Sequence, residues 1–360
     1  MSRVRAFILD DIPRVAELHE LVAAGSSRLS MEDRQRYLRE IFLDNPWYDD
    51  SLPSLVSEEQ HGRIDGFLGV LPRPMSLDGR PIRAAISSQF VVRPGQHGLT
   101  VFRLAQTFLS GAQDLSMSDG ANDVARKLWR GLGGTDSLLH GIHWTRPLRP
   151  TRYVASLASK RATLAPVAAV ARPFCTLFDA IATRVRRSPF RLTAPAPAEE
   201  LTVDALLDCF ARHAPRAKLR GEYDRKSLEW LLEMAERKRS LGQLRKVLVR
   251  NSAGEVIGWY LYYVMRGGNG EVLQIGGRQE TVGDVLEHLF HDAWSRGAIA
   301  VSGRLEPTFF DALTAKHCLL QSSAPWMLIH SRHHELVEAI LCGDAFMTRL
   351  DGEWWMAFQN

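Results

Sequence analysis

VVRPGQHGLTVFRLAQTFL, residues 91–109, is the stretch that decides the fold. An apolar strand ends at Val92, a proline and a short glycine-containing loop follow, and a helix with apolar residues at helical spacing comes next. The first amides of a helix lack intrahelical partners, and together with the helix dipole they favour an anion. We therefore expect the amides of this loop to face an anion site, with His97 and Gly98 at its rim.

Length and composition limit the class of protein. A chain of 360 residues favours two domains, and 45% hydrophobic with 24% charged residues is typical of a soluble globular protein. A net charge of +4 without RNP, zinc-finger or basic-zipper patterns argues against a nucleic-acid partner. We find no signal-peptide region and no apolar run of about 18 residues, so we expect a cytoplasmic protein.

The cysteines give no sign of a metal or of disulfides. The four of them lie far apart and form no CxxC pair, which argues against a zinc site and fits a reducing compartment. His330, His333 and His334 have helical spacing, but no carboxylate or cysteine cluster accompanies them, so a solvated helix start is the better interpretation. We expect no metal.

Apolar periodicity around the opening stretch predicts the order ααβββαβαβ. Asp10 or Asp11 is expected near the N-cap of the first helix. The predicted elements are helices over 11–24 and 31–43, β-rich runs over 53–59, 63–77 and 80–92, the helix of the opening stretch, a strand over 114–121, a helix over 122–133 and a strand pair within 136–148.

The second half of the chain repeats this pattern. Residues 246–267 align with 53–74 as an apolar strand, a glycine-centred turn and a second apolar strand, and residues 271–277 take the place of 85–92. Two copies of one βαβ-containing unit are therefore predicted, the alternative being a chance match of two hairpins. The other predicted elements are helices over 225–239, 282–297 and 306–320, a strand over 298–307 and closing strands over 325–330, 346–351 and 354–358.

Residues 152–192 differ in composition, with eight basic residues and one acidic residue, Asp179. They form either a helical linker that packs on a domain or a basic amphipathic element for an anionic membrane or a protein partner. The Pro/Ala-rich segment 194–200 marks a boundary. The predicted organisation is a domain over 1–150, a helical basic linker over 151–199 and a second domain over 200–360.

The first copy resembles the GCN5-related N-acetyltransferase (GNAT) superfamily in its element order and in four motifs. These are DIPRVAELH at 11–19, GRIDGFLGV at 62–70, VRPGQHGLT at 92–100 and NDVARKLWRGLGG at 122–134. The resemblance covers most of residues 1–150 and, more weakly, 200–360. It implies an α/β (α+β) fold of two tandem GNAT-like mixed-sheet domains, the second of them divergent.

The resemblance also implies an acyl-CoA donor at the opening loop and the following helices. Val92 and Pro94 match the family pattern, His97 stands where Arg or Gln is usual, and Thr100 and Phe102 replace small residues. By this resemblance, the residues that bind the cofactor are Val92, Gln96, His97, Gly98, Leu99, Thr100, Asn122 and Trp129.

Two of these residues have a second interpretation. Asn122 is expected either to cap its helix or to contact the ligand. Trp129 stands where the family commonly has a tyrosine that protonates the CoA thiolate; because an indole N–H is no general acid at neutral pH, Trp129 is alternatively a packed helix aromatic.

The corresponding loop of the second copy, RQETVG at 278–283, lacks the glycine-rich run and carries Glu280, with Asp284 next to it. Negative charge there disfavours a phosphate. We expect a degenerate copy that serves as a structural partner or as a wall for the acceptor.

Acyl transfer in such a fold is a direct attack by an amine, helped by a strand amide near the end of residues 85–92 that polarises the thioester. Ser88, beside the loop, and Asp119, at the end of a strand, are the candidate catalytic residues, and His143 is a further base candidate. Asp119 alternatively belongs to an Asp-Gly turn, and His143 is alternatively a satisfied strand residue.

The predicted function is acyl-CoA-dependent N-acyl transfer from acetyl-CoA or another acyl-CoA to an amine of a small molecule or amino sugar. The alternative is a non-catalytic binding or scaffold protein of this fold that has lost CoA binding, as Phe102 and Trp129 suggest. A third hypothesis is a membrane-surface component recruited through residues 152–192.

Overall fold

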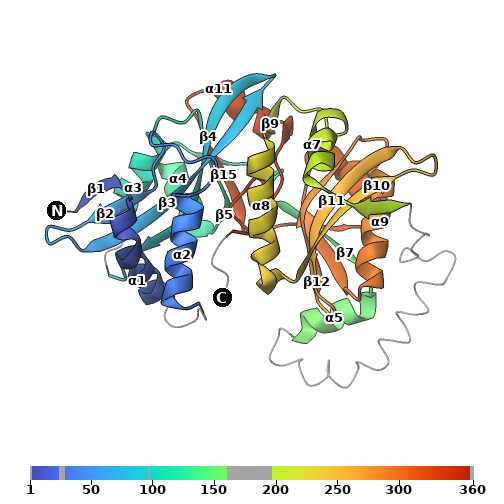
Figure 1. Ribbon diagram of the computed structural model, residues 1–360, viewed down its shortest axis with the longest axis horizontal. Coiled ribbons are helices and arrows are strands. Elements are labelled where there is room, and N and C mark those ends of the chain that lie inside the picture. Colours follow the sequence, from blue (N-terminus) through green and yellow to red (C-terminus); the bar gives the residue numbers. More distant parts are fainter. Residues whose placement is uncertain (1, 24–28, 96–97, 160–196, 357–360) are drawn as a thin grey trace. The chain divides into compact units, whose positions relative to one another are not determined.

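The computed structural model describes residues 2–23, 29–95, 98–159 and 197–356 (Figure 1). The chain divides into two compact units, each built from separate segments. The first unit contains residues 1–141, 217–234 and 323–360, and the second contains 142–216 and 235–322. These units differ from the expected continuous domains, 1–150 and 200–360, because the chain passes between the units several times.

The first unit contains a mixed sheet with strand order β1-β2-β3-β4-β5-β15-β6, to which β9 and β16 are added beside β3. Only β4 and β5 are parallel along this order. Its strands are β1 (Arg3–Ala6), β2 (Leu55–Glu58), β3 (Ile64–Leu77), β4 (Arg80–Val92), β5 (Leu115–Ala121), β6 (Thr135–Asp136), β9 (Leu219–Gly221), β15 (Trp326–His330) and β16 (Ala345–Phe346), and its helices are α1 (Ile12–Ala23), α2 (Met31–Phe42), α3 (Leu99–Leu109), α4 (Asp123–Gly131) and α11 (His334–Leu341).

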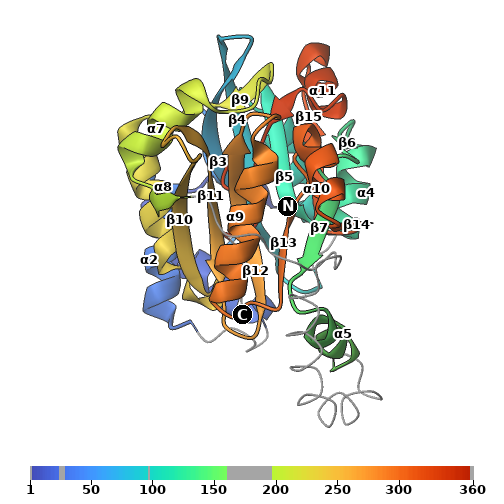
Figure 2. The same ribbon diagram turned by 90° about the vertical axis from the view of Figure 1, so that its right-hand side faces the viewer.

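The second unit repeats this topology strand for strand, in the order β8-β10-β11-β12-β13-β7-β14, and its fourth and fifth strands are again the parallel pair. Figure 2 shows α9 lying across β11 and β12. The strands are β7 (Ile142–Pro147), β8 (Ala198–Glu200), β10 (Gln243–Arg250), β11 (Val256–Val264), β12 (Asn269–Gly277), β13 (Ala300–Arg304) and β14 (Leu319–Ser322), and the helices are α5 (Pro150–Ser159), α7 (Val203–Arg212), α9 (Val282–Ser295) and α10 (Phe310–Ala315). Helix α8 (Arg225–Arg237) begins in the first unit and ends in the second.

Each sheet takes its sixth strand from the other half of the chain. Strand β7, which follows the first copy in sequence, pairs with β13 and β14, whereas β15 from the C-terminal half pairs with β5 and β6. The predicted α/β fold with two mixed sheets is confirmed, and so is the order ααβββαβαβ between α1 and β7. Sequence periodicity missed β1 and the exchange of the sixth strands.

Several predicted elements near the boundaries differ. The closing strand over 346–351 is wrong, since β16 ends at Phe346, and residues 354–356 form a turn. Residues 198 and 199 of the expected linker belong to strand β8, which pairs with β10. Helix α5 is the described part of the basic segment, and residues 160–196 lie outside the described residues. Among the helices that the structure describes, none is both long and apolar enough to cross a membrane.

The helices of the first unit cover both faces of its sheet, because two glycines of β3 let them approach closely. A Cβ on Gly69 would lie 2.3 Å from the ring of Phe42 in α2, and one on Gly66 would lie 2.7 Å from Leu104 in α3. Positions 66 and 69 differ by an odd number, so they point to opposite faces of the strand. One face therefore carries α1 and α2, and the other carries α3.

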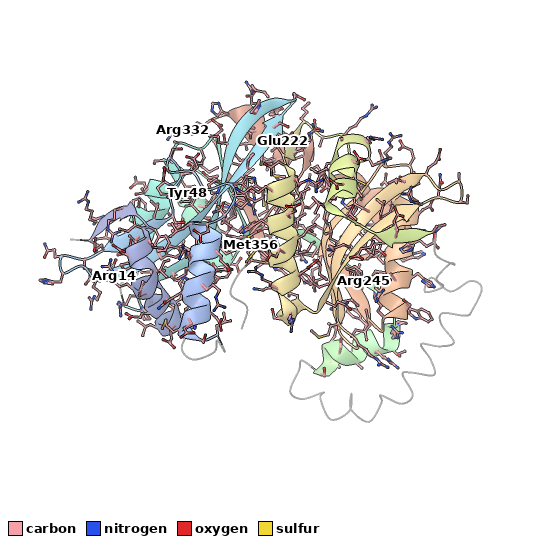
Figure 3. All side chains as sticks on the ribbon, viewed as in Figure 1. Arg14, Tyr48, Glu222, Arg245, Arg332 and Met356 are labelled. Carbon is pink, nitrogen blue, oxygen red and sulfur yellow. The ribbon has the colours of Figure 1, made fainter. Side chains whose placement is uncertain are left out.

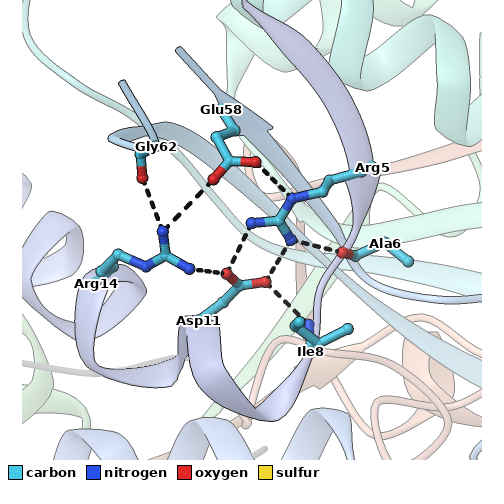
Figure 4. Close-up of polar contacts among 7 residues, drawn as sticks. All are labelled: Arg5, Ala6, Ile8, Asp11, Arg14, Glu58 and Gly62. Atoms are coloured by element: carbon cyan, nitrogen blue, oxygen red, sulfur yellow. Dashed lines mark hydrogen bonds and ion pairs between the residues drawn. The ribbon is translucent and has the colours of Figure 1, made fainter. Parts of the chain in front are cut away.

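A buried carboxylate joins β1, α1 and β2 (Figure 4). Asp11, just before α1, accepts hydrogen bonds from Arg5, Arg14 and the Ile8 amide, and Glu58 of β2 binds the same two arginines. Burial alone would raise the pKa of Asp11, but these hydrogen bonds and charges lower it. Asp11 thus holds the start of α1, near the N-cap position that the sequence predicts.

The second unit has its core between β11 and α9. Strand β11 is buried almost throughout, and its three tyrosines each donate or share a hydrogen bond. Tyr260 pairs with His288 at 2.8 Å, Tyr262 with Asp292 at 2.7 Å and Tyr263 with the Ala235 carbonyl at 2.8 Å. Burying these hydroxyls is tolerated because each has a partner.

His19 in α1 makes the stability of the first unit pH-dependent. The ring is 5% exposed, and burial, reinforced by the charge of Arg34, lowers the pKa of His19 to about 3. Between that value and the ordinary value of 6.5, only the unfolded chain binds the proton, so stability is lost as the pH falls below 6.5. We expect His19 to cost about 2 kcal/mol of unfolding free energy at pH 5 relative to pH 8.

Urea unfolding of the wild type and of His19→Gln at pH 8 and pH 5 measures this difference. The variant is expected to lose less stability between the two pH values than the wild type. Equal losses in the two proteins would contradict a neutral, buried His19.

Candidate functional site

Strands β4 and β5 separate after three paired residues. The parallel ladder joins Ala84–Ile86 to Leu115–Met117 and ends there. Beyond it, residues 87–92 of β4 and Ser118, Gly120 and Ala121 of β5 line a cavity of about 630 Å³. Where two parallel strands separate in this way, the backbone N–H and C=O groups of one strand no longer pair with those of the other.

The cavity is polar where the strands part, and most of its other walls are apolar. Ser87, Ser88, Ser118 and Glu353 are all buried and lie near the end of the ladder. The remaining walls come from α3, α4 and the C-terminal part of the chain, and the lining residues from these parts are Val101, Asn122, Val124, Ala125, Leu128, Trp129, Pro325 and Trp354.

A β-bulge shapes the β4 wall. Phe67 pairs with Val91 and Gly69 pairs with Ser88, so two residues of β4 face one residue of β3. Gln89, one of the two, has a φ of 50°, in the left-handed region that a residue with a side chain seldom adopts. A bulge leaves its extra residue outside the ladder and re-aims the neighbouring groups, and such devices occur beside functional sites.

The two helices at the cavity differ in how their N-termini are satisfied. In α4, the side chain of Asn122 accepts the amides of Val124 at 3.1 Å and Ala125 at 2.9 Å. The N-cap residue of α3 is Gly98, which has no side chain to cap the helix. The N-cap residue of α3 therefore provides no side-chain cap, and amides at a helix N-terminus favour an anion.

Glu353 reaches the gap between β4 and β5 from the C-terminal part of the chain. Its Oε1 accepts hydrogen bonds from Ser118 Oγ at 2.5 Å and from the Gly120 amide at 3.1 Å. Asp119 holds the backbone of this segment, since its Oδ1 accepts the amides of Glu353 at 2.7 Å and Trp354 at 3.0 Å. A Cβ on Gly352 would lie 2.0 Å from Asp119 Oδ2, so this close approach requires glycine.

Burial is the main cause that raises the pKa of Glu353 to about 8, and the charge of Asp119 raises it further. Hydrogen bonds from Ser118 and from the Gly120 amide act in the opposite direction. A carboxyl group with a pKa in this range can take up and release a proton near neutral pH.

Further contacts fix the segment that carries Glu353. Tyr37 of α2 donates to the carbonyl of Met356, which Figure 3 labels, at 2.5 Å. Arg73 Nε of β3 donates to the Asp351 carbonyl at 3.1 Å, and Tyr223 donates to the Asp351 carboxylate. The C-terminal segment is thus a fixed part of the first unit.

Four of the ten residues predicted to bind the cofactor or to act in catalysis line the cavity. They are Val92, Ser88, Asn122 and Trp129. Asn122 is also the helix cap that the sequence allowed, and Trp129 is also a core residue, 3% exposed and 5.9 Å from the ring of Phe108.

The other predicted residues lie elsewhere or outside the described part. Gly98 and Leu99 stand at the start of α3, exposed and not among the lining residues, and Thr100 Oγ1 donates to Asp65 at 3.2 Å instead of facing the cavity. Gln96 and His97 lie outside the described residues.

Phe102 does not fill the cavity. Its side chain is 41% exposed and is not among the lining residues, because the apolar stripe of α3 turns Leu104, Ala105 and Phe108 inward instead. The steric argument for a lost donor site therefore does not apply to this residue.

Asp119 and His143 do not face the cavity either. The Asp119 side chain holds the amides of the C-terminal segment, and His143 belongs to β7 of the second unit. Asp119 thus holds the backbone of the segment that carries Glu353. Their catalytic roles were predictions from sequence position alone.

Glu353, Trp354 and the bulge at Gln89 were not predicted from the sequence. Glu353 lies 233 positions beyond Gly120, and strand β15, which pairs with β5, brings the C-terminal part of the chain back to the first sheet. The motif DGEWW at 351–355 carries no pattern that indicates this position.

In the second unit, β12 and β13 pair over Asn269–Glu271 and Ala300–Ser302. Beyond this ladder, the Trp259 ring lies against Gly276, and its Nε1 donates to the buried Gln274 at 2.9 Å. The degeneracy of this copy as a donor site stays a prediction.

Solved structures of known proteins share this architecture over most of the chain. A conserved protein of unknown function from Enterococcus faecalis V583, described as a "Probable N-Acyltransferase", is 12% identical with a TM-score of 0.60 over 92% of this chain and 72% of its own. A GCN5-related N-acetyltransferase from Anabaena variabilis is 13% identical with a TM-score of 0.60 over 94% and 75%.

Saccharomyces cerevisiae N-myristoyltransferase, solved with bound myristoyl-CoA, is 10% identical with a TM-score of 0.50 over 92% of this chain and 78% of its own. No protein-family model and no curated protein matches the sequence. At these identities the likeness concerns the fold.

Proposed function

We propose that this chain, which has the fold of the GCN5-related N-acetyltransferases, is an acyl-CoA-dependent N-acyltransferase whose donor site is the cavity of its first unit. The observation that carries the proposal is the opening of β4 from β5 near the N-terminus of α3, whose N-cap residue, Gly98, has no side chain to cap the helix. The solved yeast neighbour contains an acyl-CoA, which supports a donor of this class.

The cavity suits the parts of such a donor. The apolar walls of Val92, Ala125 and Leu128 match the thin pantetheine arm, whose amides can pair with the backbone groups of β4 that β5 leaves unpaired. The pyrophosphate needs several converging N–H groups, and the first turn of α3 supplies them. The donor is acetyl-CoA or another acyl-CoA.

The thioester would then lie at the polar end of the cavity, beside the bulge of β4. A backbone N–H re-aimed by the bulge at Gln89 would donate to the thioester oxygen as negative charge develops on it. Holding the amine next to this carbon supplies the rest of the rate enhancement through proximity. The acceptor is an amine of a small molecule or an amino sugar, and a cytoplasmic location stays a prediction.

Calorimetric titration with CoA and acetyl-CoA, followed by an assay of thiol release with primary amines, tests this proposal. We expect micromolar binding of both ligands and release of free CoA that depends on the amine. Absence of binding at millimolar ligand would contradict it and favour a scaffold protein that keeps the fold.

A further inference from the structure

We infer that Glu353, delivered by the C-terminal segment, accepts the proton of the attacking amine, and that Asp119 is the positioning residue that holds it in place. This inference rests on the proposed function and adds a catalytic residue to it.

The first support is the chemistry of the cavity wall. Among the lining residues in the described part of the chain, Glu353 is the only one with an ionisable side chain. Its polar neighbours, Ser88 and Ser118, are hydroxyls that cannot hold a proton by themselves at neutral pH. A proton released inside the cavity has Glu353 as its nearest stable acceptor.

The second support is the position of the carboxyl group between the two faces of the sheet. Ser88 pairs with Gly69, where a Cβ would point toward Phe42 of α2, so Ser88 faces the side of α2. Its neighbour Ser87 pairs with Val70 and faces the side of α3. Met117 of β5 pairs with Ile86 of β4, which faces the same side as Ser88. Asp119, two residues after Met117, therefore also faces this side, whereas Ser118 faces the side of α3.

Glu353 is bound from both sides of this gap. Asp119 holds its backbone on the side of α2, and its Oε1 is bound by Ser118 and by the Gly120 amide, beyond the end of the β4–β5 ladder. The donor cavity lies on the side of α3 and α4. An amine that approaches the thioester from the side of α2 would therefore pass next to the Glu353 carboxylate.

The reaction balances with Glu353 as the only added group. The amine nitrogen uses its lone pair to form a bond to the thioester carbon, and the C–S bond breaks with its electron pair on sulfur. The proton that the nitrogen must lose passes to the Glu353 carboxylate. The Glu353 carboxylic acid then gives this proton to the departing thiolate, directly or through a water molecule, so that the products are an amide and CoA thiol.

The surroundings make the carboxyl group sensitive to pH. The groups that face it are the Asp119 carboxylate of β5, the Tyr37 hydroxyl of α2, and the hydroxyls of Ser88 and Ser118, and Arg73 of β3 lies near Asp119. Burial and the Asp119 charge raise the pKa of Glu353 to about 8, so the charged, proton-accepting form increases through that range. The rate should rise with pH and level off above about 8.

The test compares the wild type with Glu353→Gln, which keeps the size and the hydrogen-bond acceptor, and with Glu32→Gln as a matched control on the exposed face of α2. The probe is thiol release from acetyl-CoA, measured with spermidine, with glucosamine and with water alone as acceptor. We expect Glu353→Gln to lose about 100-fold or more in kcat at pH 8 and to lose the rise with pH. Its affinity for CoA should stay within about threefold of the wild type.

Asp119→Asn keeps an acceptor for the two amides but removes the charge. It should shift the midpoint of the pH profile downward by about half a pH unit or more, an effect that a purely structural role would not produce. This variant decides the question if Glu353→Gln does not fold.

A Glu353→Gln protein with wild-type kcat and pH profile would overturn the inference, as would an unshifted profile in Asp119→Asn. So would a wild type that binds CoA but releases no thiol with any of the three acceptors. Failure of the wild type to bind CoA would instead contradict the proposed function, and the separate binding measurement distinguishes the two cases.

Discussion

Ala125→Trp is expected to lower the affinity of the protein for CoA by about 100-fold or more. Ala125 lies on α4, half-buried, with its side chain in the wall of the cavity opposite β4. An indole at this position would occupy the space that the pantetheine arm needs, and the ligand could not bury its surface elsewhere in the cavity. Titration calorimetry of the variant measures the loss.

A matched control sits on the same helix. Lys127 is exposed and does not line the cavity, so Lys127→Trp adds the same side chain outside the cavity and should bind CoA within about threefold of the wild type. Thermal melts of both variants check that α4 still packs. Equal CoA affinity in Ala125→Trp and in the wild type would place the donor somewhere else.

Trp129→Ala should destabilise the first unit by about 3–5 kcal/mol. The indole is 3% exposed and packs against Phe108 in a core cluster that includes Leu104 and Leu328. Its removal leaves a cavity that the surrounding helices can close only in part. Urea unfolding measures the change in free energy, and Trp129→Phe, which keeps an aromatic ring, should cost less than half as much.

The same pair of variants separates packing from chemistry. Because an indole N–H does not donate a proton at neutral pH, Trp129→Phe should retain kcat within about fivefold of the wild type. A Trp129→Ala protein as stable as the wild type would contradict the packing role. A Trp129→Phe protein that is stable but inactive would indicate that the indole itself contacts the reacting groups.

The sequence predicts elements formed by local patterns. The apolar stripe of α3, the cap at Asn122 and the β-rich runs over 63–77 and 80–92 are patterns of residues close together in the sequence, and each is found in the structure. Val92, Asn122 and Trp129, three of the residues predicted to bind the donor, come from these elements or flank them and line the cavity; that they bind a donor stays a prediction.

Features that depend on distant pairing could not be predicted in this way. Whether β7 or β15 stands beside β5 is decided by tertiary packing, because both are short strands that can pair with an antiparallel neighbour. Glu353 follows β15 in the chain, so its position depends on that choice. Thr100 was assigned to the ligand by its place in a motif, but helix geometry turns its hydroxyl to Asp65.

The bulge is a third case. Gln89 adopts its left-handed conformation because β4 must fit one more residue than β3 provides, a mismatch between two strands that neither strand shows alone. The bulge sets the geometry of the proposed thioester site, so the chemistry depends on a feature of pairing and not of composition.

Photolabelling with a CoA thioester that carries a diazirine on its acyl group tests the location of the donor site most directly. The labelled peptides are identified by mass spectrometry, with and without excess CoA. We predict label on residues 87–92, 118–129 or 353–354, and its suppression by CoA. Label confined to the second unit, for example within residues 269–305, or label that excess CoA does not suppress, would contradict a donor site in the first unit.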